Sequence, residues 1–137
     1  MNELDIIIPV YNEEKNIKET LHAFKEDIKT SFRVLIVYDF NKDTTLPVAR
    51  KIKEEENFPL ELIKNRKTGV HEAIMTGFNK STAPAIIMFP ADEAYNAKII
   101  DAMYDKFKDG AHVVVASRFM KGGSIEGGPF IKTLIVR

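Results

Sequence analysis

The sequence contains no cysteine in its 137 residues. Without cysteine the chain can form neither disulfides nor thiolate metal sites, which is consistent with a reducing compartment. The sequence also lacks an excess of charge of either sign, because 20 basic and 20 acidic residues give a formal net charge of zero. No overall field therefore draws the chain to nucleic acid or to an anionic membrane, and we expect no nucleic-acid partner.

Long hydrophobic runs are absent as well. The first residues, Met1–Asp5, lack the basic start and the apolar core of a signal peptide. No later run approaches the roughly 18 apolar residues of a membrane-spanning helix. We therefore expect a cytoplasmic protein. The length and a hydrophobic share of 45% are typical of one globular domain.

Short apolar stretches alternate with stretches of helical periodicity along the chain. Apolar stretches predict buried strands at residues 4–10, 32–38, 60–63, 85–89 and 112–116. Apolar side chains at helical spacing predict helices over residues 13–29, 47–56, 70–78 and 97–109. This alternation predicts a three-layer α/β/α fold, with a mainly parallel, Rossmann-like sheet and right-handed crossovers.

Several residues suit particular positions in these elements. Asn12 is a good N-cap for the first helix, Gly77 suggests close packing against the sheet, and Gly110 suits a left-handed position after a helix. The glycine-rich stretch 121–129 comes too late for a dinucleotide or P-loop fingerprint, so we interpret it as a mobile loop. We expect the apolar tail Phe130–Val136 to pack either against the missing half of a longer protein or against a second copy of the chain.

Polar residues follow each predicted strand, where ligands bind in an open α/β sheet. Asp92 and Glu93 come directly after the apolar stretch 85–89, and adjacent carboxylates suggest a divalent cation with oxygen ligands. Alternatively, they begin the next helix, where carboxylates favour the positive end of the dipole. The other strand ends contribute Tyr11, Glu13, Asp39, Lys67 and Arg118. Acids and cations facing one cleft suit a metal-bound phosphorylated ligand.

Four segments resemble family 2 glycosyltransferases, which have the GT-A fold. Ile7–Ile17, with the sequence Ile-Ile-Pro-Val-Tyr-Asn-Glu-Glu-Lys-Asn-Ile, looks like the opening signature of that family. Leu35–Thr45 is similar to the family's strand followed by Asp-Asp-Gly-Ser-x-Asp-Gly-Thr, and Asn65–Gly77 to its loop and helix with spaced glycine and alanine. Val113–Gly123 is especially like the branch of polyprenyl-phosphate (dolichol-phosphate) mannosyltransferases.

The resemblance implies a donor site for a UDP- or GDP-linked sugar. It implies that Pro9, Tyr11 and Glu13 line the nucleotide pocket, that Asp39 bonds the base or the ribose, and that Ala91 presents backbone nearby. Lys67 is either a phosphate contact or part of a solvated loop.

The resemblance also implies how the leaving group is stabilised. Asp92, with Glu93 as a possible second acid, would hold Mg²⁺ or Mn²⁺ against the diphosphate, and Arg118 would meet phosphate charge in the bidentate way that guanidinium allows. A metal and an arginine lower the cost of a departing nucleoside diphosphate without proton transfer. The implied reaction is an inverting transfer to a polyprenyl-phosphate or saccharide acceptor, and a lipid acceptor would place the protein peripherally at the inner face of the membrane.

The sequence departs from the family pattern in three ways. Pro90 stands at the first Asp of the Asp-x-Asp motif, and Tyr38 and Phe40-Asn41 replace the first Asp and the Gly-Ser of the second segment. Family members also continue into an acceptor-binding half. We therefore expect residues 1–137 to form the nucleotide-sugar-binding part of a GT-A domain without that half.

Two other functions compete with this interpretation. One is a nucleotide- or sugar-binding module without turnover, which the proline in the Asp-x-Asp motif suggests. The other is a nucleotidyltransferase, which would carry a glycine- and arginine-rich loop after the first strand. The sequence has Tyr-Asn-Glu-Glu at that place, which disfavours the second alternative.

Overall fold

The computed structural model describes residues 1–123. The elements follow in the order β1 (Leu4–Val10), α1 (Ile17–Asp27), β2 (Phe32–Tyr38), α2 (Thr45–Glu56), β3 (Leu60–Lys64), α3 (Val70–Lys80), β4 (Ala85–Met88), the 3₁₀ helix η1 (Ala94–Ile99) and α4 (Ile100–Lys108). In this range no helix has the length and apolar character needed to cross a membrane. The apolar tail, the dimer expected through it and most of the glycine-rich loop lie outside the described residues.

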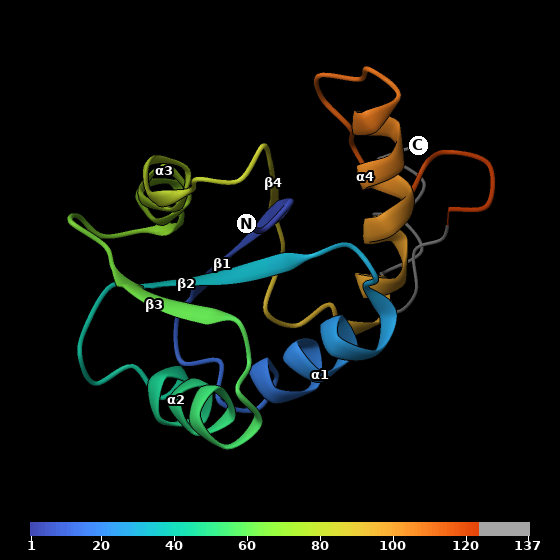
Figure 1. Cartoon of the computed structure of the whole chain (residues 1–137). Helices are drawn as coiled ribbons and strands as arrows, with labels where there is room; N and C mark the ends of the chain where they lie inside the picture. Colours follow the sequence, from blue (N-terminus) through green and yellow to red (C-terminus); the bar gives the residue numbers. More distant parts are fainter. Residues whose placement is uncertain (124–137) are drawn as a thin grey trace, which may run out of the picture.

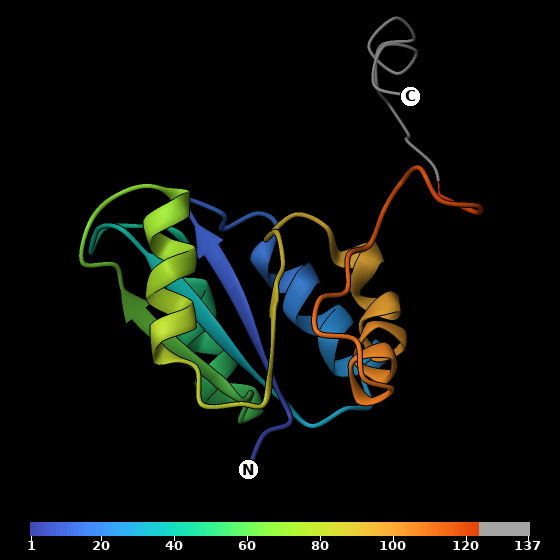
Figure 2. The same cartoon turned by 90° about the horizontal axis from the view of Figure 1, so that it is seen from above.

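The four strands form one parallel sheet with the order β3-β2-β1-β4 (Figure 1). Helix α3 packs over β1 and β2 on one face, while α1 and α2 cover the other face (Figure 2). The predicted three-layer α/β fold is therefore confirmed. Parallel strands need such crossover helices, and they leave the sheet buried on both faces at its centre.

Side chains of β1 alternate between two apolar cores. Ile6 and Ile8 belong to the core beneath α1 and α2, whereas Ile7 belongs to the core beneath α3. Full burial of such a side chain contributes about 1.5–3 kcal/mol. Gly77 of α3 lies directly over Ile7, because a Cβ at residue 77 would approach Ile7 Cγ2 to 2.6 Å. The close helix–sheet packing predicted from this glycine is confirmed.

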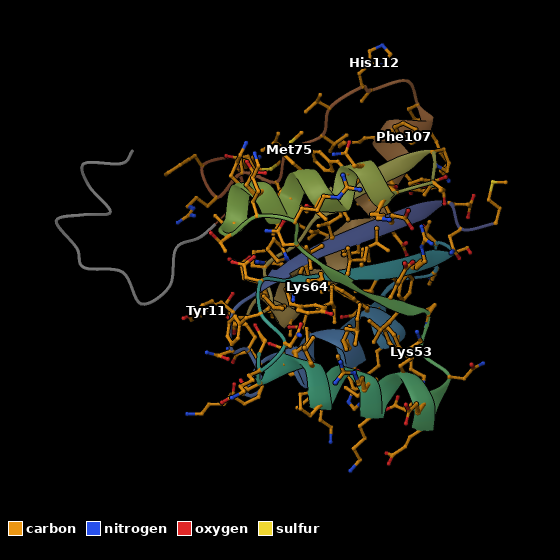
Figure 3. The ribbon with its side chains drawn as sticks, turned by 90° about the vertical axis from the view of Figure 1, so that its left-hand side faces the viewer. Tyr11, Lys53, Lys64, Met75, Phe107 and His112 are labelled. Carbon is orange, nitrogen blue, oxygen red and sulfur yellow. The ribbon has the colours of Figure 1, made fainter. Side chains whose placement is uncertain are left out.

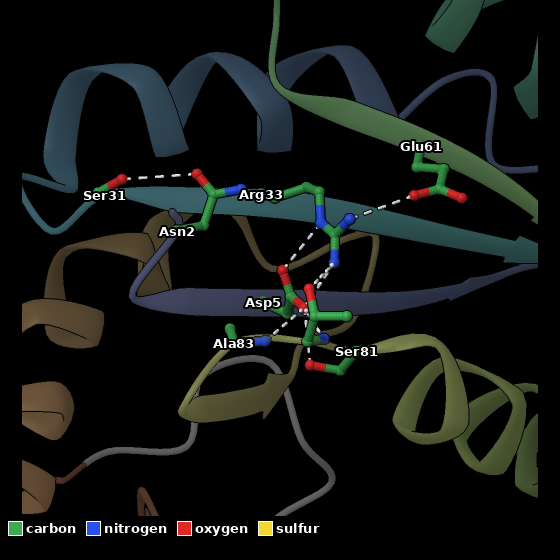
Figure 4. A network of polar contacts seen from close by, with 8 residues as sticks. Asn2, Asp5, Ser31, Arg33, Glu61, Ser81 and Ala83 are labelled. Atoms are coloured by element: carbon green, nitrogen blue, oxygen red, sulfur yellow. Dashed lines mark hydrogen bonds and ion pairs between the residues drawn. The ribbon is translucent and has the colours of Figure 1, made fainter.

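A buried ion pair fixes the amino ends of the strands (Figure 4). The fully buried carboxylate of Asp5 on β1 accepts hydrogen bonds from Arg33 Nε at 3.0 Å and from Arg33 Nη2 at 2.8 Å. It also accepts hydrogen bonds from the Ser81 hydroxyl and from the backbone N–H groups of Thr82 and Ala83. This network connects the α3–β4 loop to β1 and β2 at the amino end of the sheet. The predicted site lies at the opposite, carboxyl end.

Burial raises the pKa of Asp5, but the hydrogen bonds from Arg33, Ser81 and Thr82 outweigh it and hold the pKa below its ordinary value. The carboxylate therefore stays ionised although it is buried. The sequence pattern did not indicate this group, because its partners lie on other elements.

The predicted strand at 112–116 is wrong. Residues 109–123, which are the described part of the chain after α4, contain no strand, and Val113 and Val115 are 81% and 75% exposed. Valine favours strands because its side chain packs on a pleated, partly buried surface. Residues 112–116 lie beside β4, since His112 and Val114 line one groove with Ile86 and Ile87, but they form no ladder with that strand, and Val113 and Val115 face outward.

The expectation that the strand at 85–89 is buried on both faces is also wrong. Strand β4 lies at the edge of the sheet, and its side chains Ile86 and Met88 are 40% and 48% exposed. They share a face with Asp5 and Ile7 of the paired strand, which α3 covers over β1 and β2. A strand at the edge of a sheet pairs with only one neighbour, so its side chains are buried only where a helix covers that edge.

Helix boundaries differ at two places. The first helix begins at Ile17 rather than at Glu13, and Asn12 adopts a left-handed conformation with φ of 54° instead of capping it. The helix predicted over residues 97–109 begins earlier, as η1, and continues as α4 to Lys108. Gly110 has φ of 105°, which confirms its predicted left-handed position.

Candidate functional site

The register of the sheet aligns the carboxyl ends of β1, β2 and β3. Val10 of β1 pairs with Tyr38 of β2, which pairs with Lys64 of β3. Figure 3 shows Tyr11 and Lys64 at this end of the sheet. The residues that directly follow these three strands are Tyr11, Asp39 and Asn65.

Strand β4 ends earlier but runs towards the same edge. Ile7 pairs with Met88, and the backbone N–H of Phe89 donates to the Ile7 carbonyl at 2.9 Å. Asp92 follows Met88 by the same number of residues that separate Ile7 from Tyr11. The loops that follow all four strands therefore lie at the carboxyl end of the sheet, which is where ligands bind in an open α/β sheet.

A polar latch joins the loops after β1 and β2, and it consists of Asn12, Glu13, Asp43, Thr44 and Thr45. The backbone N–H of Asn12 donates to both carboxylate oxygens of Asp43 at 3.2 Å, and the N–H of Thr45 donates to Asp43 Oδ1 at 2.9 Å. In return, the Thr44 N–H donates to Asn12 Oδ1, and the Glu13 N–H donates to Thr45 Oγ1. Asp43 is only 1% exposed and Thr45 is buried, so the centre of this latch is buried and fully bonded, while Asn12 and Thr44 lie at the surface.

Sequence reasoning missed the latch. Its only signal was an Asp followed by two Thr in a loop of turn-forming residues, a combination that often caps a helix. The partner loop, 31 positions away, could not be inferred from that signal.

Two aromatic rings meet above the latch. The rings of Tyr11 and Phe40 have centroids 5.4 Å apart and planes inclined by 60°, which is an edge-to-face pair. Tyr11 is 68% exposed and Phe40 is half-buried. The pair presents an open aromatic surface at the predicted nucleotide pocket.

Asp39 is bonded to the loop after β3. Its Oδ2 accepts a hydrogen bond from the Gly69 N–H at 2.8 Å, and its Oδ1 accepts one from Asn65 Nδ2 at 2.9 Å. Asn65 is buried and accepts a hydrogen bond from the Thr76 hydroxyl, which ties the loop to α3. Each Asp39 oxygen can accept a further hydrogen bond, so the carboxylate can both hold this loop and receive a donor from a ligand.

Lys67 lies on the same loop and is exposed. Its Nζ is 3.6 Å from Glu72 Oε1 in the first turn of α3. Such surface pairs contribute at most about 1 kcal/mol. An incoming anion can therefore compete for Lys67.

The loop after β4 is anchored through its backbone. The hydroxyl of Thr20 on α1 donates to the Ala91 carbonyl at 2.7 Å, and both residues are buried. This bond fixes the residue immediately before the exposed Asp92. Ala91 thus directs its carbonyl to α1, directly before the acid at position 92.

The two acids are both exposed but differ in their hydrogen bonds. The Glu93 carboxylate accepts a hydrogen bond from Asn96 Nδ2 at 2.7 Å, and the Glu93 carbonyl accepts one from the Asn96 N–H. Glu93 directly precedes η1 as its N-cap residue, which agrees with the alternative interpretation for this acid. Over residues 1–123, no three His, Cys, Asp or Glu side chains form a cluster that could hold a metal alone.

The acids nonetheless fit Mg²⁺ or Mn²⁺ in one way. These ions prefer oxygen ligands and are often bound through one or two carboxylates together with phosphates of the substrate. Asp92 offers such an oxygen, and the remaining ligands would come from a bound diphosphate and water.

Pro9 and Arg118 differ in how the sheet positions them. Pro9 lies inside β1 opposite Val37 of β2, and its missing N–H ends the pairing with β4, whose last ladder bond runs from the Phe89 N–H to the Ile7 carbonyl. Arg118 is exposed on a turn after α4, and within the described part of the chain it forms neither a hydrogen bond nor an ion pair. The sheet brings Tyr11, Asp39 and Asp92 to one edge, whereas no strand carries Arg118 there.

The architecture is that of GT-A glycosyltransferases. The S. aureus TarS structure (residues 1–349) superposes with a TM-score of 0.62 at 21% identity, covering 85% of this chain and 39% of that chain. The mannosyltransferase PcManGT from Pyrobaculum calidifontis, in complex with GDP-Man and Mn²⁺, gives a TM-score of 0.59 at 23% identity and covers 72% and 31%.

The chain belongs to glycosyl transferase family 2, whose family model matches residues 5–132. The dolichol-phosphate mannosyltransferase of Pyrococcus furiosus is 26% identical over 135 residues, which are 97% of this chain and 38% of that protein. The undecaprenyl-phosphate 4-deoxy-4-formamido-L-arabinose transferase of Pseudomonas fluorescens is 34% identical over 93 residues, or 65% of this chain and 27% of that protein. The family resemblance inferred from the sequence is confirmed, and the chain spans well under half the length of these relatives.

Proposed function

We propose that the carboxyl edge of the sheet binds a UDP- or GDP-linked sugar for an inverting glycosyl transfer. One observation carries this proposal: in a chain of family 2, loops from four parallel strands meet at one edge and bring acids, an aromatic pair and a lysine with them. The relatives named as transferases acting with polyprenyl phosphates support a lipid-phosphate acceptor, and a saccharide is the alternative acceptor.

The nucleoside would lie over the loops after β1 and β2. Tyr11 offers an exposed ring face for the base, with Pro9 and Glu13 beside it as walls of the pocket. Asp39 would accept a hydrogen bond from the base or the ribose with the lone pairs that its loop contacts leave free.

The diphosphate would lie towards the loops after β3 and β4. Lys67 would exchange Glu72 for a phosphate oxygen. Asp92, with Glu93 as its neighbour and the Ala91 backbone as its anchor, would hold Mg²⁺ or Mn²⁺, which when bound neutralises charge on the departing diphosphate. Arg118 would add a bidentate phosphate contact if its turn folds over the bound donor. The Mn²⁺ in the structurally similar mannosyltransferase complex supports the metal.

The residues assigned above all concern the sugar donor, and none of them is assigned to binding the acceptor. A phosphate acceptor is already ionised and needs no general base, whereas a sugar hydroxyl needs one. We propose that residues 1–137 form the donor-binding part and that an acceptor-binding half completes the domain, as the greater length of the relatives suggests. With a lipid acceptor, the protein would work at the cytoplasmic surface of the membrane.

Calorimetric titration tests the donor site. UDP, GDP and their sugars are titrated with and without Mn²⁺ into the unaltered chain and into Asp92→Asn, Asp39→Ala and the control Asp27→Asn, whose carboxylate is exposed at the end of α1. We expect binding tighter than about 1 mM, weakened by Asp39→Ala, and a Mn²⁺ effect that Asp92→Asn abolishes. Binding no better than millimolar for every nucleotide would refute the donor site, and metal-independent binding would refute only the ligand role of Asp92.

A further inference from the structure

Phe40 occupies a position that the established family pattern gives to glycine, and the structure provides it with a contact. Its ring packs edge-to-face with Tyr11, at 5.4 Å between centroids. We propose that Phe40 is a base-recognition residue: it holds the Tyr11 ring in place and forms a side wall against a planar aromatic base. This inference rests on the proposed donor site and gives a specific role to a residue that the sequence marked only as a departure from the family pattern at the base.

A hydrogen-bonded turn carries Phe40. The Phe40 carbonyl accepts a hydrogen bond from the Asp43 N–H at 3.1 Å, which closes a turn between the two residues. The carboxylate of Asp43 in turn holds Asn12, the neighbour of Tyr11. Both aromatic rings therefore stand on loops that one buried carboxylate connects.

Tyr11 needs such a support if it is to bind a base. With 68% of its surface exposed, its ring has few other contacts to restrict rotation. A freely rotating ring must be ordered when a ligand stacks on it, and this ordering weakens binding. Contact with the half-buried Phe40 orders the ring in advance, because aromatic pairs prefer the offset or edge-to-face geometry seen here.

Recognition by aromatic rings differs from recognition by hydrogen bonds. Every nucleobase has a flat π face, so stacking depends little on which base is present. Phe40 should therefore distinguish nucleotides from phosphates without a base, rather than UDP from GDP. Pyrophosphate, which carries the phosphates and no base, is the probe that separates these two effects.

Calorimetry in the presence of Mn²⁺ tests the assignment. GDP, UDP and inorganic pyrophosphate are titrated into the unaltered chain and into Phe40→Ala, Phe40→Leu and Phe40→Tyr. The control is Phe78→Ala, which removes a partly exposed aromatic ring from α3. We expect Phe40→Ala to weaken GDP and UDP each by about tenfold, the size of one lost aromatic contact. Pyrophosphate binding should stay unchanged in all variants. Phe40→Tyr should bind nucleotides as well as the unaltered chain does, whereas Phe40→Leu should bind them as weakly as Phe40→Ala. The control Phe78→Ala should bind nucleotides like the unaltered chain.

The outcomes separate this inference from the proposed function. If the unaltered chain binds nucleotides and Phe40→Ala does not change their affinity, the role of Phe40 is refuted and the donor site stands. Equal losses for pyrophosphate and nucleotides, or full rescue by leucine, would show that Phe40 only maintains the loop and would also refute its role. If the unaltered chain binds no nucleotide, the donor site itself fails and the inference fails with it.

Discussion

The Asp43 carboxylate accepts the backbone N–H of Asn12 with both of its oxygens at 3.2 Å, across 31 positions of the sequence. The bond joins the loops that carry Tyr11 and Phe40. It also explains why Asn12 can hold a left-handed backbone, since its own side chain accepts the Thr44 N–H in return. One buried acid thereby connects the stability of the fold with the geometry of the candidate site.

Replacing this acid should affect stability and binding together. Asp43→Asn replaces one carboxylate oxygen by an amide N–H₂, so the Asn12 N–H loses one of its two acceptors and faces a donor instead. We expect a loss of about 2 kcal/mol in the free energy of unfolding, measured by urea denaturation, and weaker nucleotide binding by calorimetry. Asp27→Asn, the exposed control, should change neither quantity by a measurable amount. Unchanged stability in Asp43→Asn would mean that other contacts hold the two loops.

The bond between Thr20 and Ala91 makes a second prediction. Thr20→Val keeps the shape of the side chain but leaves the buried Ala91 carbonyl without its donor. We expect destabilisation by about 1–3 kcal/mol and a smaller effect of Mn²⁺ on nucleotide affinity, because Asp92 follows the freed carbonyl. Thr20→Ser, which retains the hydroxyl, should recover most of both losses. A Mn²⁺ effect that survives Thr20→Val would show that this anchor does not position Asp92.

The ion pair of Asp5 and Arg33 should make stability depend on pH. The pKa of Asp5 is lower in the folded protein than in the unfolded chain, so the unfolded chain binds the proton more readily. The contribution is therefore fully present above the unfolded pKa of about 3.9 and is lost as the pH falls through the folded value. Asp5→Asn leaves Arg33 without its main partner, and we expect a loss of about 3 kcal/mol at pH 7.

Denaturation at several pH values measures this effect. The difference in unfolding free energy between the unaltered chain and Asp5→Asn should be largest at pH 7 and should shrink below pH 4. Asp101, whose pKa is also lowered although burial opposes the shift, is unchanged in both proteins and so cancels in the comparison. A difference that is constant from pH 7 to pH 3 would contradict the assigned ionisation of Asp5.

The contact between Gly77 and Ile7 makes a prediction about packing. Gly77→Ala places a methyl group where Ile7 already lies, and the overpacking should cost about 1–3 kcal/mol although alanine is the better helix former. Adding Ile7→Ala should make the Gly77→Ala change less costly, which a double-mutant cycle measures. Asn79→Ala, at an exposed position of the same helix, is the control and should be neutral or slightly stabilising. Additive effects of Gly77→Ala and Ile7→Ala would argue against the contact.

Hydrophobic periodicity was sufficient for most of the fold. The alternation of apolar stretches and helical patterns predicted four strands and the helices between them, and Gly77 and Gly110 were interpreted correctly. It failed for Val113 and Val115, because a β-favouring sequence becomes a strand only when its backbone pairs with another strand, and this segment lies beside β4 without a ladder. It also placed the start of the first helix too early. The side-chain oxygen of Asn12, expected to cap that helix, accepts instead the N–H of Thr44, the residue before α2.

The sequence by itself determined the order of the elements from β1 to β4 and the residues that follow these strands, because those features depend on neighbours within a few positions, and the alternation of strands with helices indicated a parallel sheet. Only the tertiary structure decided that β4 lies at the edge, that Asp5 pairs with Arg33, that Thr20 anchors Ala91 and that Asp43 joins two loops. These contacts link residues 28 to 71 positions apart, and local patterns carry no information about which distant groups will be brought together when the sheet forms.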